Sequence, residues 1–171
     1  MKKEGNHSKQ LTEGLLLIYL IILVWIILLK FGVRFTYMEK RDFNLIPFAN
    51  GYFDNLETIL NIVVFIPLGI YTSILFSNWT FKLNLLIFFL ISLMFEALQY
   101  EFKLGVFDVT DLLTNTTGGI FGYILVWQTQ KFFSSPLRTQ KFINIIAAIS
   151  TSLIVLLLVL LKLGLLPIKY Q

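Results

Sequence analysis

The sequence predicts an all-α fold, a polytopic membrane helical bundle with about five transmembrane helices. Three observations predict it. The chain of 171 residues is 57% hydrophobic and 14% charged, whereas soluble domains carry roughly 25% charged residues. It contains no cysteine, which excludes disulfide scaffolds, cysteine-ligated zinc and thiol nucleophiles. Its apolar residues gather in five stretches, and a helix that crosses a bilayer core needs ~20 such residues.

The first apolar stretch covers residues 15–29 and contains no charge. It follows a polar, basic leader (1–13) and lacks a cleavage site with small residues, so it predicts an uncleaved first span and not a signal peptide. The lone His7 of the leader has no ligand partner, and we expect it to be solvated. The leader, one transmembrane domain (14–165) and a tail (166–171) make up the expected organisation.

The second, third and fourth stretches cover residues 58–76, 82–100 and 109–127, and the fifth covers 143–161. The first and fifth qualify as spans on hydropathy alone, while the middle three contain polar residues and glycine. The loop of residues 30–57 contains an apolar segment, 43–48, that we expect to lie at the membrane interface. Pro47 in this segment disfavours helix at Ile46 and favours an extended or turned backbone.

Five spans place the loops alternately on two sides of the membrane, and the acidic residues divide unequally between these sides. Each side has seven Lys or Arg, but two acids lie on the leader side and eight on the other, which gives net charges of +5 and −1. Because the basic residues tie, the positive-inside rule gives no orientation by count. The basic leader favours a cytoplasmic N-terminus and an outward-facing acidic side, in a multi-pass membrane protein.

Polar residues inside the apolar stretches gather at the ends that border the acidic side. Glu96 and Gln99 share one helical face, because they are three residues apart. Asp111 and Asn115 share a face of the fourth stretch, and Asn61 lies near the start of the second. A carboxylate in hydrocarbon costs at least ~2.5 kcal/mol and requires a partner. We therefore expect an intramembrane polar site, although Asp108 also fits a simple helix N-cap.

Small residues and proline predict how the spans pack. Gly118, Gly119 and Gly122 allow a neighbouring backbone to approach closely, so this stripe should face protein. Pro67, two residues before Gly69, removes a backbone hydrogen bond and predicts a kink with a freed carbonyl at Val63.

Four linked motifs resemble the VanZ-like family. They are Asn44-Leu45-Ile46-Pro47-Phe48, Asn61-x3-Phe65-x-Pro67-x-Gly69, Glu96-x2-Gln99 and Asp108-x2-Asp111-x3-Asn115-x2-Gly118-Gly119-x2-Gly122. The resemblance covers about residues 43–125 with order and spacing intact. Many members have an arginine shortly before the first aspartate, where this chain offers only Lys103.

The resemblance implies a bacterial membrane protein related to one that confers low-level resistance to teicoplanin, a lipoglycopeptide. It also implies a set of ligand-contacting residues: Asn44, Pro47, Phe48, Asn61, Phe65, Glu96, Gln99, Asp108, Asp111 and Asn115. Pro67, Gly69, Gly118, Gly119 and Gly122 are then structural. The acids would bind a cationic group, and Phe43, Phe48 and Phe65 would line an acyl chain.

Several functions remain open at this point. The first is binding of, or protection against, a lipid-linked wall precursor or lipid-tailed antibiotic at the outer leaflet. The second is an enzyme acting on a lipid, with Glu96, Asp108 and Asp111 ligating a divalent cation, which is the one cofactor that the sequence suggests. Further alternatives are a small proton-coupled transporter, which would need a homo-oligomer, and an assembly factor. Membrane lipids are expected partners, whereas the scattered basic residues argue against nucleic acid.

Overall fold

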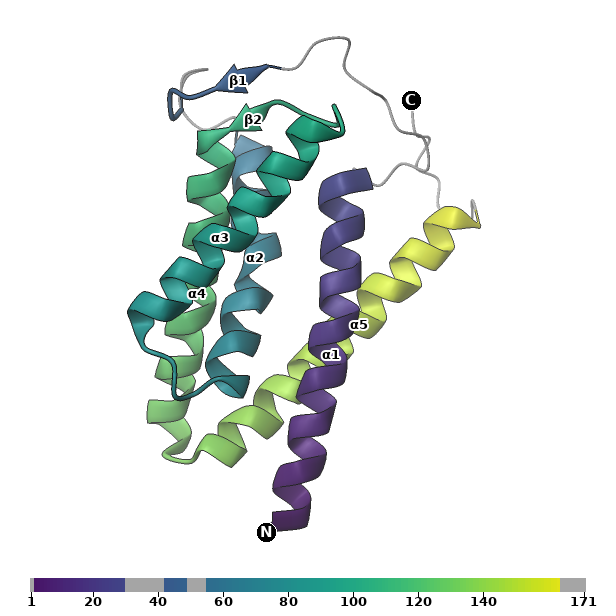
Figure 1. Cartoon of the computed structure of the whole chain (residues 1–171). Coiled ribbons are helices and arrows are strands. Elements are labelled where there is room, and N and C mark those ends of the chain that lie inside the picture. The colour runs from purple at the N-terminus through teal and green to yellow at the C-terminus, as the bar shows by residue number, and fades with distance from the viewer. Residues whose placement is uncertain (1, 30–41, 49–54, 164–171) are drawn as a thin grey trace.

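The computed structural model describes residues 2–29, 42–48 and 55–163, and within these ranges it is a helical bundle (Figure 1). The predicted fold class is confirmed. The elements in chain order are α1 (Lys2–Leu29), β1 (Phe43–Asn44), α2 (Asn55–Leu75), α3 (Phe81–Glu101), β2 (Phe107–Asp108), α4 (Val109–Phe133) and α5 (Pro136–Lys162).

Helix α1 starts at Lys2 and includes most of the segment that the sequence suggested as a separate polar leader. Glu4 in its first turn complements the positive end of the helix dipole. Ser8 and Thr12 of the leader are buried, because they pack against α5. The expected boundary between residues 13 and 14 therefore has no counterpart in the secondary structure, while His7 is exposed as expected.

Four helices of the described residues are long and apolar enough to cross a membrane, namely α1, α2, α3 and α5. The stretch expected as the fourth span forms α4, which has 25 residues but is not among these four. Its first half contains an aspartate, an asparagine, four threonines and two adjacent glycines, which lower its mean hydropathy. Helix α4 lies beside α2 and α3 in the bundle, where part of this polar half is covered (Figure 1).

Helices α2 and α4 approach each other to backbone contact through glycine. A Cβ atom on Gly118 would overlap the carbonyl of Ile62, and one on Gly122 would overlap the carbonyl of Ile66. In the other direction, a Cβ on Gly69 would overlap the carbonyl of Gly119. Such close approach lets Cα–H groups contact carbonyl oxygens across the interface. The glycines thus hold α2 and α4 together as one packed pair.

Helix α2 runs through Pro67 without interruption. The expected freed carbonyl is Val63, whereas the structure satisfies the next one along: the Tyr19 hydroxyl donates to the Val64 carbonyl at 3.0 Å. Proline cannot donate a backbone hydrogen bond, so the carbonyl that loses its helical partner is Val63, four residues earlier. The tyrosine attaches α1 to α2 one turn before the proline.

The two ends of the bundle differ in what they carry. In Figure 1 one end holds β1, β2, the start of α2, the end of α3 and the start of α4. The opposite end holds the N-terminus and the connections between α2 and α3 and between α4 and α5. Between them lies an aromatic core in which Phe65, Phe88 and Phe95 are at most 2% exposed. We call the first end the acidic end and the second the basic end, after their sequence charges.

Candidate functional site

A pair of two-residue strands organises the acidic end. Strands β1 and β2 are parallel, with Phe43 opposite Phe107 and Asn44 opposite Asp108. The ring of Phe43 also lies 4.3 Å from the ring of Tyr100, between centroids. The extended backbone predicted before Pro47 is thus present at residues 43–44, while residues 30–41 and 49–54 of the same loop lie outside the described part of the chain. The strand pair brings Asn44 to the start of α4.

Asp108 has two positioning roles at this start. It is the N-cap of α4, and its Oδ1 accepts from the backbone N–H of Thr110 at 2.7 Å. Its Oδ2 accepts from Nδ2 of Asn44 at 2.9 Å. The N-cap interpretation of the sequence is therefore correct, but it accounts for only one oxygen. Because the carboxylate also lies at the positive end of a helix dipole, its negative charge is favoured there.

Glu96 joins α3 to the same point. Its side chain is 2% exposed, and its Oε2 accepts from the backbone N–H of Asp108 at 3.0 Å. The chain returns to this place because α3 ends in a left-handed turn at Lys103, where the N–H of Leu104 donates to the carbonyl of Gln99 at 2.8 Å. Glu96 thus fixes the backbone immediately before α4.

Asn61 and Asp111 form the contact between α2 and α4 at this end. Nδ2 of Asn61 donates to Oδ1 of Asp111 at 2.7 Å. Both residues are partly exposed. This bond connects the polar starts of α2 and α4.

A second, deeper layer of carboxamides lies behind these groups. Nδ2 of Asn115 donates to the hydroxyl of Ser92 at 3.0 Å, and both residues are at least 96% buried. Nε2 of Gln99 donates to the carbonyl of Ile27 in α1 at 3.0 Å. These bonds connect α3 to α4 and to α1. The network therefore has an accessible layer with Asn44, Asn61, Asp108 and Asp111, and a buried layer that holds the helices in place.

Three other residues of the expected site lie outside these two layers. Pro47 and Phe48 are exposed, and the N–H of Phe48 donates to the Thr110 hydroxyl at 3.0 Å. Phe65 is fully buried and packs edge-on against Phe95. It belongs to the core, so the expectation that it lines an acyl chain is wrong for this structure. Its spacing from Asn61 places it one turn deeper in the bundle.

The residues expected to hold a divalent cation do not form a ligand set. Among the described residues, no three side chains of His, Cys, Asp or Glu lie close enough to hold a metal ion together. Glu96 faces a backbone N–H, Asp108 faces Asn44 and Thr110, and Asp111 faces Asn61. The carboxylates are instead distributed along a hydrogen-bonded network.

Sequence reasoning missed Ser92 and Thr110, which are hydrogen-bond partners of expected site residues. A serine four residues before Glu96 was the available signal, since it lies on the same helical face. It also missed a polar network at the basic end, between α1 and α5. A lone asparagine, Asn144, next to the long apolar run of the fifth stretch was the signal for that network.

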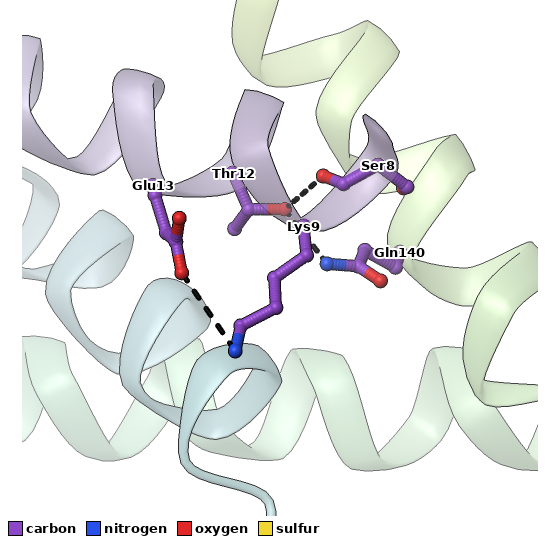
Figure 2. A network of polar contacts seen from close by, with 5 residues as sticks. All are labelled: Ser8, Lys9, Thr12, Glu13 and Gln140. Carbon is purple, nitrogen blue, oxygen red and sulfur yellow. Dashed lines mark hydrogen bonds and ion pairs between the residues drawn. The ribbon is translucent and has the colours of Figure 1, made fainter. Parts of the chain in front are cut away.

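This second network is compact and buried (Figure 2). The Thr12 hydroxyl lies 2.9 Å from the Ser8 carbonyl and accepts from Nε2 of Gln140 at 2.9 Å. Nδ2 of Asn144 donates to the Ser8 carbonyl at 2.9 Å. Thr12 and Asn144 are at most 2% exposed. Around the network, Lys9 lies 3.8 Å from Glu13.

Two comparisons with known proteins match most of the chain. Residues 16–134 match the family model described as VanZ/LLP1. The chain is also similar to Protein VanZ of Enterococcus faecium, with 36% identity over 157 residues, which are 89% of this chain and 93% of that protein. No solved structure matches the chain. The residues that the family model matches contain the acidic-end network and the glycine interface, but not Ser8, Thr12, Gln140 or Asn144 of the basic-end network.

Proposed function

Because this chain belongs to the VanZ family, we propose that it protects the bacterial cell envelope by binding a lipid-tailed amphiphile at the outer leaflet. The ligand class is a lipoglycopeptide of the teicoplanin type or a lipid-linked cell-wall precursor. The chain is a membrane protein by family and by its four apolar helices. In the proposed orientation the acidic end faces outward and the N-terminus lies in the cytoplasm.

The observation that carries this proposal is the two-layer network at the acidic end. Its buried layer, with Glu96 and Asn115, fixes the helices, while Asp108 and Asp111 remain partly accessible. Partly exposed carboxylates that are already positioned by hydrogen bonds are suited to bind a cationic group with little further ordering. The side with net charge −1 and eight acids supplies the attracting field.

An apolar surface beside this network supports an amphiphilic ligand. Phe43, Leu45, Ile46 and Phe48 are between 42% and 69% exposed. They follow one another along a segment that is attached to the start of α4 through β1 and Thr110. A contiguous exposed apolar segment next to polar groups is typical of a site that binds lipid or a lipid tail. A single amphiphile would then place its charged part at the acids and its chain on this segment.

The test is drug susceptibility in a Gram-positive host that expresses the chain. Asp111→Asn keeps an oxygen that accepts from Asn61 and removes the charge, so it separates electrostatic binding from structure. We expect wild type to raise the inhibitory concentration of teicoplanin and Asp111→Asn to return it to the empty-vector value. Vancomycin, which has no lipid tail, should be affected less.

The matched control is Glu57→Gln. Glu57 is an exposed acid in the first turn of α2 at the same end, so its loss changes the field by the same charge. It should leave the teicoplanin response at the wild-type level. Wild-type protein that is present in the membrane and leaves teicoplanin susceptibility unchanged would exclude the antibiotic as ligand. Equal losses in Asp111→Asn and Glu57→Gln would exclude the network as the site.

A further inference from the structure

A groove opens between α1 and α5 at the basic end of the bundle. Its volume is about 570 Å³, within the ~300–1,000 Å³ range of small-molecule sites. Leu11, Ile145, Ala148 and Ile149 form its apolar part. Both helices are apolar enough to cross a membrane, so this part of the groove lies where lipid chains are available.

The polar wall of the groove is held rigidly. Ser8 and Asn144 line it, and Asn144 donates to both the carbonyl and the hydroxyl of Ser8, at 2.9 and 3.3 Å. Behind them, Gln140 donates to the hydroxyl of Thr12 (Figure 2). Because these buried groups satisfy one another, the wall exists before any ligand arrives.

The mouth of the groove is charged. Lys141, Glu4 and His7 line it, and Nζ of Lys141 lies 3.7 Å from Oε2 of Glu4. Both side chains are about half exposed, and ion pairs of this kind contribute little and exchange partners readily. Arg138 is exposed one turn before Lys141 on the same helical face. This side of the bundle has a net charge of +5, so it attracts anions.

We propose that the groove between α1 and α5 binds an anionic phospholipid, with its phosphodiester at Lys141 and one acyl chain along Leu11, Ile145 and Ile149. The phosphate replaces Glu4 as the partner of Lys141, and the field of the basic end favours a lipid with net negative charge over a zwitterionic one. The groove lies at the opposite end of the bundle from the acidic network. In the proposed orientation, its lipid belongs to the cytoplasmic leaflet.

The experiment is native mass spectrometry of the full chain in detergent, titrated with phosphatidylglycerol or with phosphatidylcholine of the same acyl chains. Wild type should retain phosphatidylglycerol more strongly. Lys141→Gln should lower that affinity about five-fold, the effect of one basic residue at an anionic lipid surface. Lys82→Gln removes an exposed lysine from the same side, outside the groove lining, and should have no effect.

Two further variants test the charge and the shape of the groove. Glu4→Gln frees Lys141 and should strengthen phosphatidylglycerol binding. Ala148→Phe fills the apolar part and should weaken binding, whereas Ile146→Phe, on an exposed position outside the lining, should not. Weaker binding in Glu4→Gln would show that the site takes a zwitterionic headgroup, and equal retention of the two lipids would show that charge plays no part. Either result overturns the proposal. A wild-type dimer that Ala148→Phe dissociates would also overturn it, because the groove would then bind a second copy of the chain and not a lipid.

These outcomes are independent of the drug-susceptibility test. Asp111→Asn should retain phosphatidylglycerol at the wild-type level, because its position lies at the other end of the bundle. Failure of the lipid measurements therefore leaves the acidic site unaffected, and failure of the susceptibility test leaves the groove unaffected.

Discussion

The contact of α2 with α4 makes a sharp prediction for Gly122→Ala. A Cβ at this position would meet the carbonyl of Ile66, the backbone nitrogen of Ile70 at 2.8 Å and Cα of Gly69 at 3.0 Å. All three are backbone atoms, so no side chain can rotate away. The added methyl group is accommodated only if the two helices separate, and that separation weakens the rest of their interface.

The expected magnitude follows from two opposing effects. Alanine favours a helix over glycine by about 1 kcal/mol, while overpacking a close interface destabilises by about 1–3 kcal/mol. With backbone on every side we take the upper end, so Gly122→Ala should lower the free energy of unfolding by about 2 kcal/mol. Gly119→Ala should be milder, because its Cβ meets the ring of Phe88, which is a side chain.

The assay is reversible unfolding in mixed micelles with increasing denaturing detergent, followed by circular dichroism. Gly14→Ala is the matched control, since a Cβ there meets nothing within 4 Å. It should leave stability unchanged or raise it by about 1 kcal/mol. A Gly122→Ala protein as stable as Gly14→Ala would refute the argument that backbone contact between α2 and α4 requires glycine.

Three further predictions concern hydrogen bonds. Asn144→Leu should lower the free energy of unfolding by about 1 kcal/mol in the same assay, because buried donors and acceptors lose their partner. Tyr19→Phe removes the donor to the Val64 carbonyl and should lower the free energy of unfolding by about 1 kcal/mol; a variant as stable as wild type contradicts this. Glu96→Leu should speed hydrogen exchange at the Asp108 amide, measured by mass spectrometry, with exchange in α5 unchanged.

The fold class and the places of most helices could be predicted from the sequence, because long apolar stretches have few alternatives. The start of α1 could not be predicted in this way. Its polar residues read as a solvated leader because the sequence gives no sign that Thr12 meets Asn144, 132 residues later. Such pairs form only when the helices pack, and hydropathy along the chain does not report them.

The candidate site was predicted in part for a similar reason. Spacing on a helix shows which residues share a face, so Glu96 and Asp111 were assigned to the inner faces of their helices. It does not show how deep in the bundle a residue lies or which residue it contacts. Phe65 lies one helical turn after Asn61 and is buried in the core. Glu96, Asp108 and Asp111, which the sequence suggested as metal ligands, each accept from a different hydrogen-bond donor.

The strand pair at the acidic end suggests where this protein tolerates change. Asn61 lies on α2 and Asp111 on α4, and these helices pack closely through glycine. A substitution at either residue therefore disturbs the contact between the two helices. The segment of residues 43–48 is attached to the start of α4 by two residue pairs between β1 and β2 and by the Thr110 hydroxyl. Leu45 and Ile46 of this segment are 64% and 69% exposed, and a library randomised at these two positions is where altered tail selectivity should be sought first.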